Sequence, residues 1–261
     1  MTRRGVDGTR TRIIAFAGVL VATLLAAATA SASPYIQAHR GGSLDSVKGE
    51  QRPLFPESSM AAFKEAARRG FVLELDVKLS ADHRPVVIHD GTLDRTTNCE
   101  GPVASLTLAQ LRGDCEIDVL GTNGNERPLG AGDDRRARIP TLRRVLKMAR
   151  ERGAEVNIEI KNLPTDPDFD PSDGYAQTVA NEVKRSAIPP SRVIFQSFLP
   201  QNLSVVQGDP YFERAETSFL TLKSLEAAGP AIADGAGYDW ISPEWPVGPG
   251  YVEEAHALGL R

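Results

Sequence analysis

Short runs of strand-forming residues alternate with helical patterns from residue 34 onward, and this alternation restricts the fold more than any other feature. Such an order is typical of a parallel sheet covered by helices. A chain of 261 residues has the length of one TIM-type α/β barrel, which needs about 250 residues. We therefore predict an α/β barrel. Its strands are expected at residues 35–39, 72–77, 85–89, 156–160, 192–198, 215–220 and 238–243.

The helical patterns carry their own start and stop signals. Ser58 or Ser59 can cap a helix that ends at Gly70, and Thr141 opens another helix that ends before Gly153. Weaker patterns predict helices near residues 175–186, 201–207, 222–233 and 250–258.

Two long linkers, residues 98–138 and 162–174, follow strands and should lie over the barrel face on which active sites are found. The second linker contains Asp166, Asp168 and Asp170 at alternate positions, a spacing similar to that of a calcium-binding loop. It lacks glycine at the sixth position and has Gln177 at the twelfth, where an EF-hand has glutamate. We therefore predict a solvated loop.

The first 33 residues differ in kind from the rest. Four arginines precede an apolar run from Ile13 to about Ala28, and small residues follow. This pattern is typical of a secretory signal peptide. An uncleaved membrane anchor is the alternative, but the run is short and rich in alanine. We expect residues 34–261 to form a secreted or extracytoplasmic (cell-envelope) barrel domain with no stable membrane span after cleavage.

Charge and cysteine content narrow the possible partners and compartment. Removal of residues 1–30 would take away four arginines and one aspartate, which lowers the formal net charge from −4 to −7. A chain this acidic is a poor polyanion binder, so nucleic acid is not an expected partner. An oxidising compartment favours a disulfide between Cys99 and Cys115, and two unpaired thiols are the alternative.

Two predicted strands carry carboxylates on the face that should point into the barrel. Alternation in VLELDVKL places Glu74, Asp76 and Lys78 on one side, and alternation in VNIEIKN does the same for Glu159 and Lys161. Converging carboxylates repel one another unless a cation lies between them, and oxygen ligands favour Mg²⁺ or Ca²⁺. Ordinary ion pairs with the lysines are the alternative.

Two of the four histidines, His39 and His89, end predicted strands and are followed by turn-forming residues. A single histidine at a strand end is usually structural, but two beside a carboxylate-bearing strand indicate an acid–base pair. His89 is followed by Asp90, and such polar residues after an apolar run indicate a role. Arg40 and Lys161 add positive charge, which suits a phosphate. The residues therefore predict phosphodiester cleavage.

The stretches AHRGG (38–42), FPESSMAAFKEAARRGFVLELDVKLSADHRPVVIHDGTLDRTTNCEG (55–101) and VNIEIK (156–161) resemble the glycerophosphodiester phosphodiesterase family in order and spacing. The resemblance implies a TIM-type barrel that uses a divalent cation, Ca²⁺ or Mg²⁺. It also implies hydrolysis of a small-molecule glycerophosphodiester to glycerol 3-phosphate and an alcohol. By motif, His39 and His89 would be the two catalytic proton carriers.

The same motifs imply the remaining site residues. Glu74, Asp76 and Glu159 would be the metal ligands, and Arg40 and Lys161 would bind the substrate phosphate. A further match is Glu57, whose role in the family pattern is open. It can contact the metal, orient Arg40, or act only at the start of a helix.

The family's last strand, which carries a Trp-Thr-x-Asn signature, has no match after the final stretch EEAHALGLR. We therefore expect seven of the eight strands, with weak activity or low solubility, because an open barrel exposes backbone edges. A phospholipase acting on phosphatidylinositol or sphingomyelin lipids would share the barrel, the histidines and the metal. A catalytically impaired secreted barrel is the other alternative.

Overall fold

The computed structural model of the protein describes residues 35–42, 44–47, 50–121 and 126–261. The predicted signal peptide, residues 1–33, lies outside this range, so it stays a prediction. Within the described residues, no helix is both long and apolar enough to cross a lipid bilayer.

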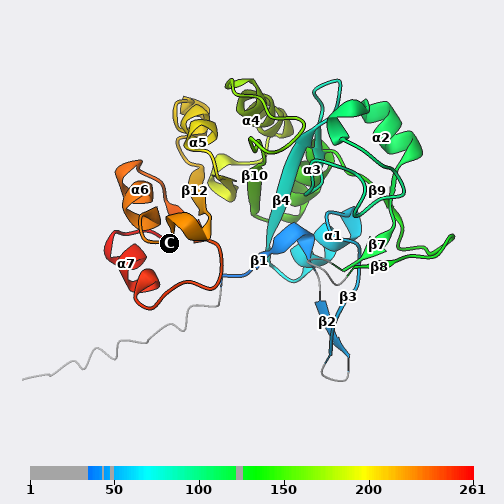
Figure 1. Ribbon diagram of the computed structural model, residues 1–261, viewed down its shortest axis with the longest axis horizontal. Coiled ribbons are helices and arrows are strands. Elements are labelled where there is room, and N and C mark those ends of the chain that lie inside the picture. Colours follow the sequence, from blue (N-terminus) through cyan, green and yellow to red (C-terminus); the bar gives the residue numbers. More distant parts are fainter. Residues whose placement is uncertain (1–34, 43, 48–49, 122–125) are drawn as a thin grey trace, which may run out of the picture. The chain divides into compact units, whose positions relative to one another are not determined.

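One seven-stranded sheet organises the domain Tyr35–Arg261. Six strands run parallel in the order β1, β4, β10, β11, β12 and β13, and β5 pairs antiparallel with β4. Figure 1 labels β1, β4, β10 and β12 of this sheet. The strands are β1 Gln37–Ala38, β4 Val72–Leu79, β5 Pro85–Val87, β10 Val156–Ile160, β11 Val193–Ser197, β12 Glu216–Thr221 and β13 Trp240–Pro243. This curled parallel sheet is that of an incomplete TIM-type barrel, and all seven predicted strands are confirmed.

The direction of β5 differs from the predicted parallel arrangement. Only residues 80–84 connect β4 to β5, whereas a parallel crossover needs about a dozen residues or more. The chain therefore turns back at once, and β5 pairs with the end of β4 from Val77 to Leu79. His89 follows this hairpin strand rather than a barrel strand.

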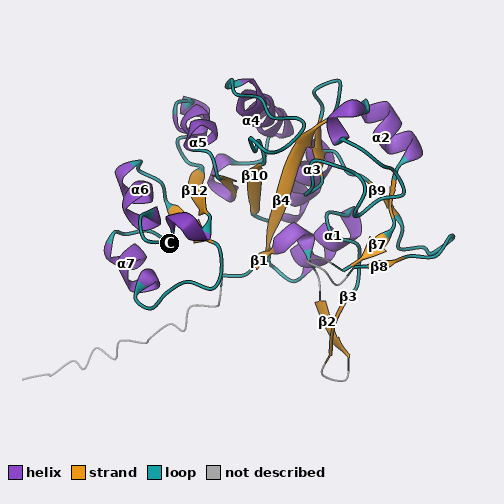
Figure 2. Ribbon diagram, in the orientation of Figure 1, coloured by secondary structure: helices purple, strands orange, loops and turns teal. Residues whose placement is uncertain are grey.

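Helices alternate with the parallel strands (Figure 2). They are α1 Met60–Arg68, α3 Leu142–Arg152, α4 Gly174–Ser186, α5 Pro200–Gln207, α6 Gly229–Gly235 and α7 Tyr251–Ala257. The predicted caps are present, since Ser59 and Thr141 accept backbone hydrogen bonds at the starts of α1 and α3. The helix predicted at 222–233 is shorter, because α6 begins only at Gly229, with Pro230 in its first turn.

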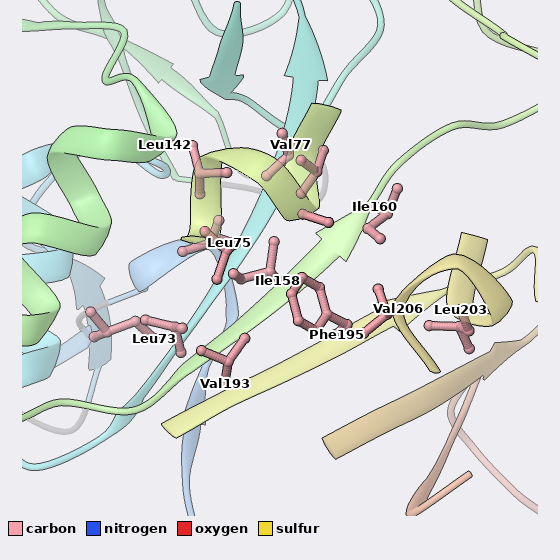
Figure 3. Close-up of a cluster of buried hydrophobic side chains, with 14 of the residues drawn as sticks. Leu73, Leu75, Val77, Leu142, Ile158, Ile160, Val193, Phe195, Leu203 and Val206 are labelled. Atoms are coloured by element: carbon pink, nitrogen blue, oxygen red, sulfur yellow. The ribbon is translucent and has the colours of Figure 1, made fainter. Parts of the chain in front are cut away.

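The hydrophobic core lies between the sheet and the helices that pack on it. Leu73, Leu75 and Val77 of β4 are fully buried, and Figure 3 shows them with Ile158 of β10 and Phe195 of β11. Because side chains alternate along a strand, this packing turns the intervening polar residues of β4 and β10 toward the other face. That face carries the candidate site.

The linker 98–138 is a small folded insertion rather than a featureless loop. It contains α2 Leu108–Asp114 and the short strands β6 Glu116–Ile117, β7 Val119–Leu120, β8 Arg127–Pro128 and β9 Ala137–Arg138. A second buried cluster, which includes Leu93, Leu111 and Ile117, packs beneath it. The predicted disulfide between Cys99 and Cys115 is confirmed. A hairpin of β2 Leu44–Val47 and β3 Glu50–Pro53 was also not predicted.

The prediction of a solvated loop at 162–174 is wrong for two of its aspartates. Asp166 and Asp168 form ion pairs with the ammonium of Lys78, whose side chain is fully buried. The same ammonium donates to the carbonyl of Lys161 at 2.7 Å. A buried ammonium is costly without a partner, so these carboxylates fold in over the end of β4.

Candidate active site

The three carboxylates predicted as metal ligands lie together on neighbouring strands. Glu74 and Asp76 come from β4 and Glu159 from β10, and each offers an oxygen within 4.8 Å of the others. All three side chains are buried. The register pairs Glu159 directly with Asp76, so the β4–β10 ladder itself sets the spacing. The predicted convergence is confirmed.

Glu74 is held by two hydrogen bonds. The backbone N–H of Arg40 donates to its Oε2 at 2.7 Å, and Gln196 of β11 donates to its Oε1 at 3.0 Å. Arg40 adopts a left-handed backbone conformation, with φ of 56°. Burial, followed by repulsion from Asp76, raises the pKa of Glu74 well above its usual value. Sequence reasoning missed Gln196, because its contact depends on a third strand.

Lys161 supplies part of the charge balance. Its ammonium lies 3.1 Å from Asp76 Oδ1 and 3.2 Å from Glu159 Oε2. Burial opposes ionisation of Asp76, but the charges of Lys161, His89 and Arg40 and a hydrogen bond with Glu159 together lower the pKa of Asp76 to about 2. Burial and the charge of Asp76 raise the pKa of Glu159 to about 8. Ordinary ion pairs, the alternative interpretation, therefore explain only part of the cluster. In the described residues, Lys161 is the one ammonium that pairs with its carboxylates.

The donor set of this acidic cluster fits a hard divalent cation. In the described part of the chain, no hydrogen-bond donor reaches the buried Oδ2 of Asp76. Its ion-pair contact with Arg40 Nε is long, at 3.9 Å. Burying an ionised oxygen without a close partner is costly, and a cation among three carboxylates removes that cost. Glu74, Asp76 and Glu159 are the residues that would hold it.

The two histidines approach this cluster from separate segments. His39 directly follows β1, and His89 follows β5. Both interact electrostatically with Asp76, so both lie near the acidic cluster. His39 is exposed and the side chain of His89 is 26% exposed, so each can meet a ligand from solvent. The structure therefore brings the predicted proton carriers to the predicted ligands.

Glu57 is in hydrogen-bond contact with Arg40. Both of its carboxylate oxygens lie 3.3 Å from Arg40 Nη1, and Arg95 donates to the same carboxylate at 2.6 Å and 3.2 Å. Ser59, not Glu57, caps α1. Of the three roles left open for Glu57, the contacts favour the orientation of Arg40. Arg95 was missed, although it lies in the DGTLDRTT stretch that follows His89.

Fold and site together define a class of protein, a TIM-type barrel with an acidic, cation-type cluster beside two histidines. The chain belongs to the glycerophosphoryl diester phosphodiesterase family, whose model matches residues 39–260.

Curated relatives agree with this family. The glycerophosphodiester phosphodiesterase of Caldanaerobacter subterraneus subsp. tengcongensis is 40% identical over 126 residues, which cover 48% of this chain and 44% of that protein. Glycerophosphodiester phosphodiesterase 1 of Rattus norvegicus is 39% identical over 107 residues, 41% of this chain and 27% of that protein. The matched segments thus span less than half of each relative.

Solved structures share the fold. The glycerophosphodiester phosphodiesterase of Agrobacterium tumefaciens str. C58 has a TM-score of 0.55 at 27% identity, with 80% of each chain covered. A phosphodiesterase of Oleispira antarctica, solved with the product sn-glycerol-3-phosphate, has a TM-score of 0.64 at 21% identity, with 87% of this chain and 82% of that chain covered.

Proposed function

We propose that this protein hydrolyses glycerophosphodiesters to glycerol 3-phosphate and an alcohol, with a divalent cation, Ca²⁺ or Mg²⁺, as cofactor. The observation that carries the proposal is the cluster of three buried carboxylates within 4.8 Å, beside an ammonium and two histidines. Family membership supports the same reaction. The Oleispira antarctica phosphodiesterase, which shares the fold, was solved with its product sn-glycerol-3-phosphate, and this supports the proposed product.

Each side chain has a role in this proposal. Glu74, Asp76 and Glu159 hold the cation, which when bound neutralises charge on the phosphate oxygens. Arg40 and Lys161 bind the same phosphate, because guanidinium and ammonium groups both pair with anionic oxygens.

His39 and His89 move the protons. One imidazole accepts the proton of the attacking hydroxyl as the new P–O bond forms, and the other protonates the alcohol oxygen as its P–O bond breaks. The nucleophile is the substrate's own glycerol hydroxyl, which gives a cyclic phosphate. Water then adds to phosphorus and opens the ring, with the two imidazoles exchanging roles.

The test is an assay of glycerol 3-phosphate release from glycerophosphocholine, with and without a chelator. We expect release that the chelator abolishes and that added Mg²⁺ or Ca²⁺ restores. His39→Ala and His89→Ala should each lose at least about 100-fold in kcat, as expected for general acid–base groups. The matched control is His256→Ala, an exposed position on α7, which should keep full activity. Full activity in either active-site variant would defeat the assignment.

Phosphatidylinositol and sphingomyelin vesicles form the second arm of the same assay. Cleavage of these lipids in preference to glycerophosphocholine would show that the protein is a phospholipase, and the proposed substrate class would then be wrong. If the protein turns over none of these diesters, the result would favour the alternative of a catalytically impaired barrel.

We also propose that the protein works outside the cytoplasm after loss of residues 1–33. The disulfide Cys99–Cys115 supports an oxidising compartment, because thiols are kept reduced in the cytosol. Sequencing the N-terminus of protein recovered from an expressing cell's envelope and medium tests this. An intact N-terminus in a cytosolic fraction would contradict it.

A further inference from the structure

Asp90 is placed to hold the ring of His89. The Nδ1 of His89 and the Oδ1 of Asp90 are 2.5 Å apart, and both side chains are about three-quarters buried, at 26% and 24% exposure. A carboxylate accepts and does not donate when ionised. The contact therefore places the proton on Nδ1 and leaves Nε2 as the atom that can exchange a proton with a substrate.

Arg95 holds Asp90 in turn. Its Nε donates to Asp90 Oδ2 at 2.6 Å and its Nη2 donates to Asp90 Oδ1 at 3.1 Å, so the guanidinium grips both oxygens. Burial opposes ionisation of Asp90, but the hydrogen bonds from His89 and Arg95 outweigh it and lower the pKa of Asp90. A planar fork of this kind fixes a carboxylate in orientation as well as in charge.

The same guanidinium reaches the other side of the site. Arg95 Nη2 lies 2.6 Å from Glu57 Oε1, and Glu57 binds Arg40. One side chain thus connects the histidine proposed to move a proton with the arginine proposed to bind the phosphate. The backbone bond from Thr97 N to Leu93 O, at 3.1 Å, holds the turn that carries Arg95.

We propose that Asp90 and Arg95 are positioning residues for this reaction. Asp90 fixes the tautomer and orientation of His89. Arg95 fixes the positions of His89 and Arg40 relative to one another, because it binds Asp90 and Glu57. The inference rests on the proposed function for the reaction it serves, but the tautomer of His89 can be measured without any turnover. The competing explanation is an ion-pair network that only stabilises the loop.

The first experiment reads the tautomer directly. ¹⁵N NMR of histidine-labelled protein, with His89→Ala to assign the signals, should show His89 protonated on Nδ1 at an alkaline pH where imidazole is neutral. Asp90→Asn should shift the population toward the Nε2-protonated form. Asp94→Asn is the matched control, since Asp94 lies in the same turn, is exposed, and accepts a hydrogen bond from the backbone N–H of Gly101 at 3.2 Å.

The second experiment is a kinetic double-mutant cycle. Asp90→Asn should lower kcat at least about tenfold with little change in KM, and the same change should have no further effect in a His89→Ala background. Arg95→Lys, which keeps the charge but loses the fork, should lower kcat and raise KM together. Arg136→Lys is its control, because Arg136 pairs with Glu116 at 3.0 Å in the insertion and should change neither constant.

The outcomes distinguish the positioning role of Asp90 from the proposed diesterase activity. An unchanged His89 tautomer in Asp90→Asn would overturn the positioning role whether or not the protein turns over a diester. Equal losses from Asp90→Asn in the wild-type and His89→Ala backgrounds would also overturn it, because a stabilising network acts independently of His89. A protein inactive toward every diester, but with the expected tautomer shift, would refute the proposed function alone.

Discussion

At the residue scale, Gly41 has the closest neighbour of the glycines that the structure describes. It follows Arg40 and has a φ of 70°, and a Cβ added there would lie 2.7 Å from Phe63 Cδ1. Phe63 is fully buried on α1, so it cannot move away without opening the core. The absence of a side chain at Gly41 therefore lets the His39–Gly41 turn lie directly against α1.

We predict that Gly41→Ala lowers the free energy of unfolding by about 3 kcal/mol, the sum of left-handed strain and overpacking. Gly70→Ala is the control, because Gly70 has a similar φ of 75° but nothing within 4 Å of its added Cβ. That variant should lose only about 1 kcal/mol. Urea unfolding measures both. Equal losses would show that Phe63 adjusts and that the close contact has no cost.

The predictability of individual site residues depended on what determines their positions. Glu74, Asp76 and Glu159 were predictable, because alternation along two strands decides which face a side chain takes. Arg95 and Gln196 were not, since a loop and a third strand bring them in. No periodic pattern in the sequence marks such contacts.

At the element scale, Lys78 ties the loop after β10 to the end of β4. Its buried ammonium contacts Asp168 Oδ1 at 3.1 Å as well as Asp166, and Tyr175 of α4 also donates to Asp168. Lys78→Met would leave these carboxylates without their cation. Removing one partner of a buried ion pair typically costs about 3 kcal/mol or more.

We therefore predict a loss of about 3 kcal/mol in the free energy of unfolding of Lys78→Met, together with faster proteolysis within residues 162–174. Lys147→Met is the matched control. Lys147 is exposed on α3 and its contact with Glu151 is 3.8 Å, so the change should stay within about 0.5 kcal/mol. A stable Lys78→Met with an intact loop would show that the aspartates do not need the ammonium.

The insertion 98–138 depends on its disulfide. Cys99 and Cys115 enclose the loop that carries Val103 and Leu111 of the second buried cluster, and that cluster is small. In the chain-entropy view, a cross-link of this span stabilises by about 3 kcal/mol. We predict that the double variant Cys99→Ser, Cys115→Ser loses about this amount in denaturant unfolding. A reducing agent should produce the same loss in wild type and none in the variant, and a shift in both would point to another cause.

Elements were predicted more completely where they belong to the barrel than in the insertion. The barrel strands and helices repeat one pattern and so reinforce one another in the sequence. The strands β6, β7, β8 and β9 have two residues each, too short to show any period. The reversed direction of β5 follows from the length of a turn, which the strand pattern does not encode.

At the scale of the whole molecule, the two ends of the sheet approach one another at one point. The ring of Tyr35, just before β1, stacks on Trp240 of β13 with centroids 5.2 Å apart. The guanidinium of Arg261 lies over the ring of Trp240, 4.4 Å from the ring centroid. The indole Nε1 of Trp240 donates to Glu216 Oε2 at 2.7 Å. The backbone of Arg261 forms hydrogen bonds with Ile241 of β13 and with Asp239, the residue before that strand.

This aromatic contact should couple the first and last strands of the sheet energetically. Stacked pairs contribute about 0.5–1.5 kcal/mol beyond the area they bury. We predict a coupling free energy of about 1 kcal/mol in a double-mutant cycle of Tyr35→Ala and Trp240→Ala, measured by urea unfolding. Circular dichroism should be the probe, because Trp240→Ala removes one of only two tryptophans. Tyr211→Ala with Trp240→Ala is the control cycle, since Tyr211 packs on Phe212 instead, and it should be additive. Additivity in the Tyr35 cycle would mean that the stack carries no coupling and that β1 and β13 are held only through the strands between them.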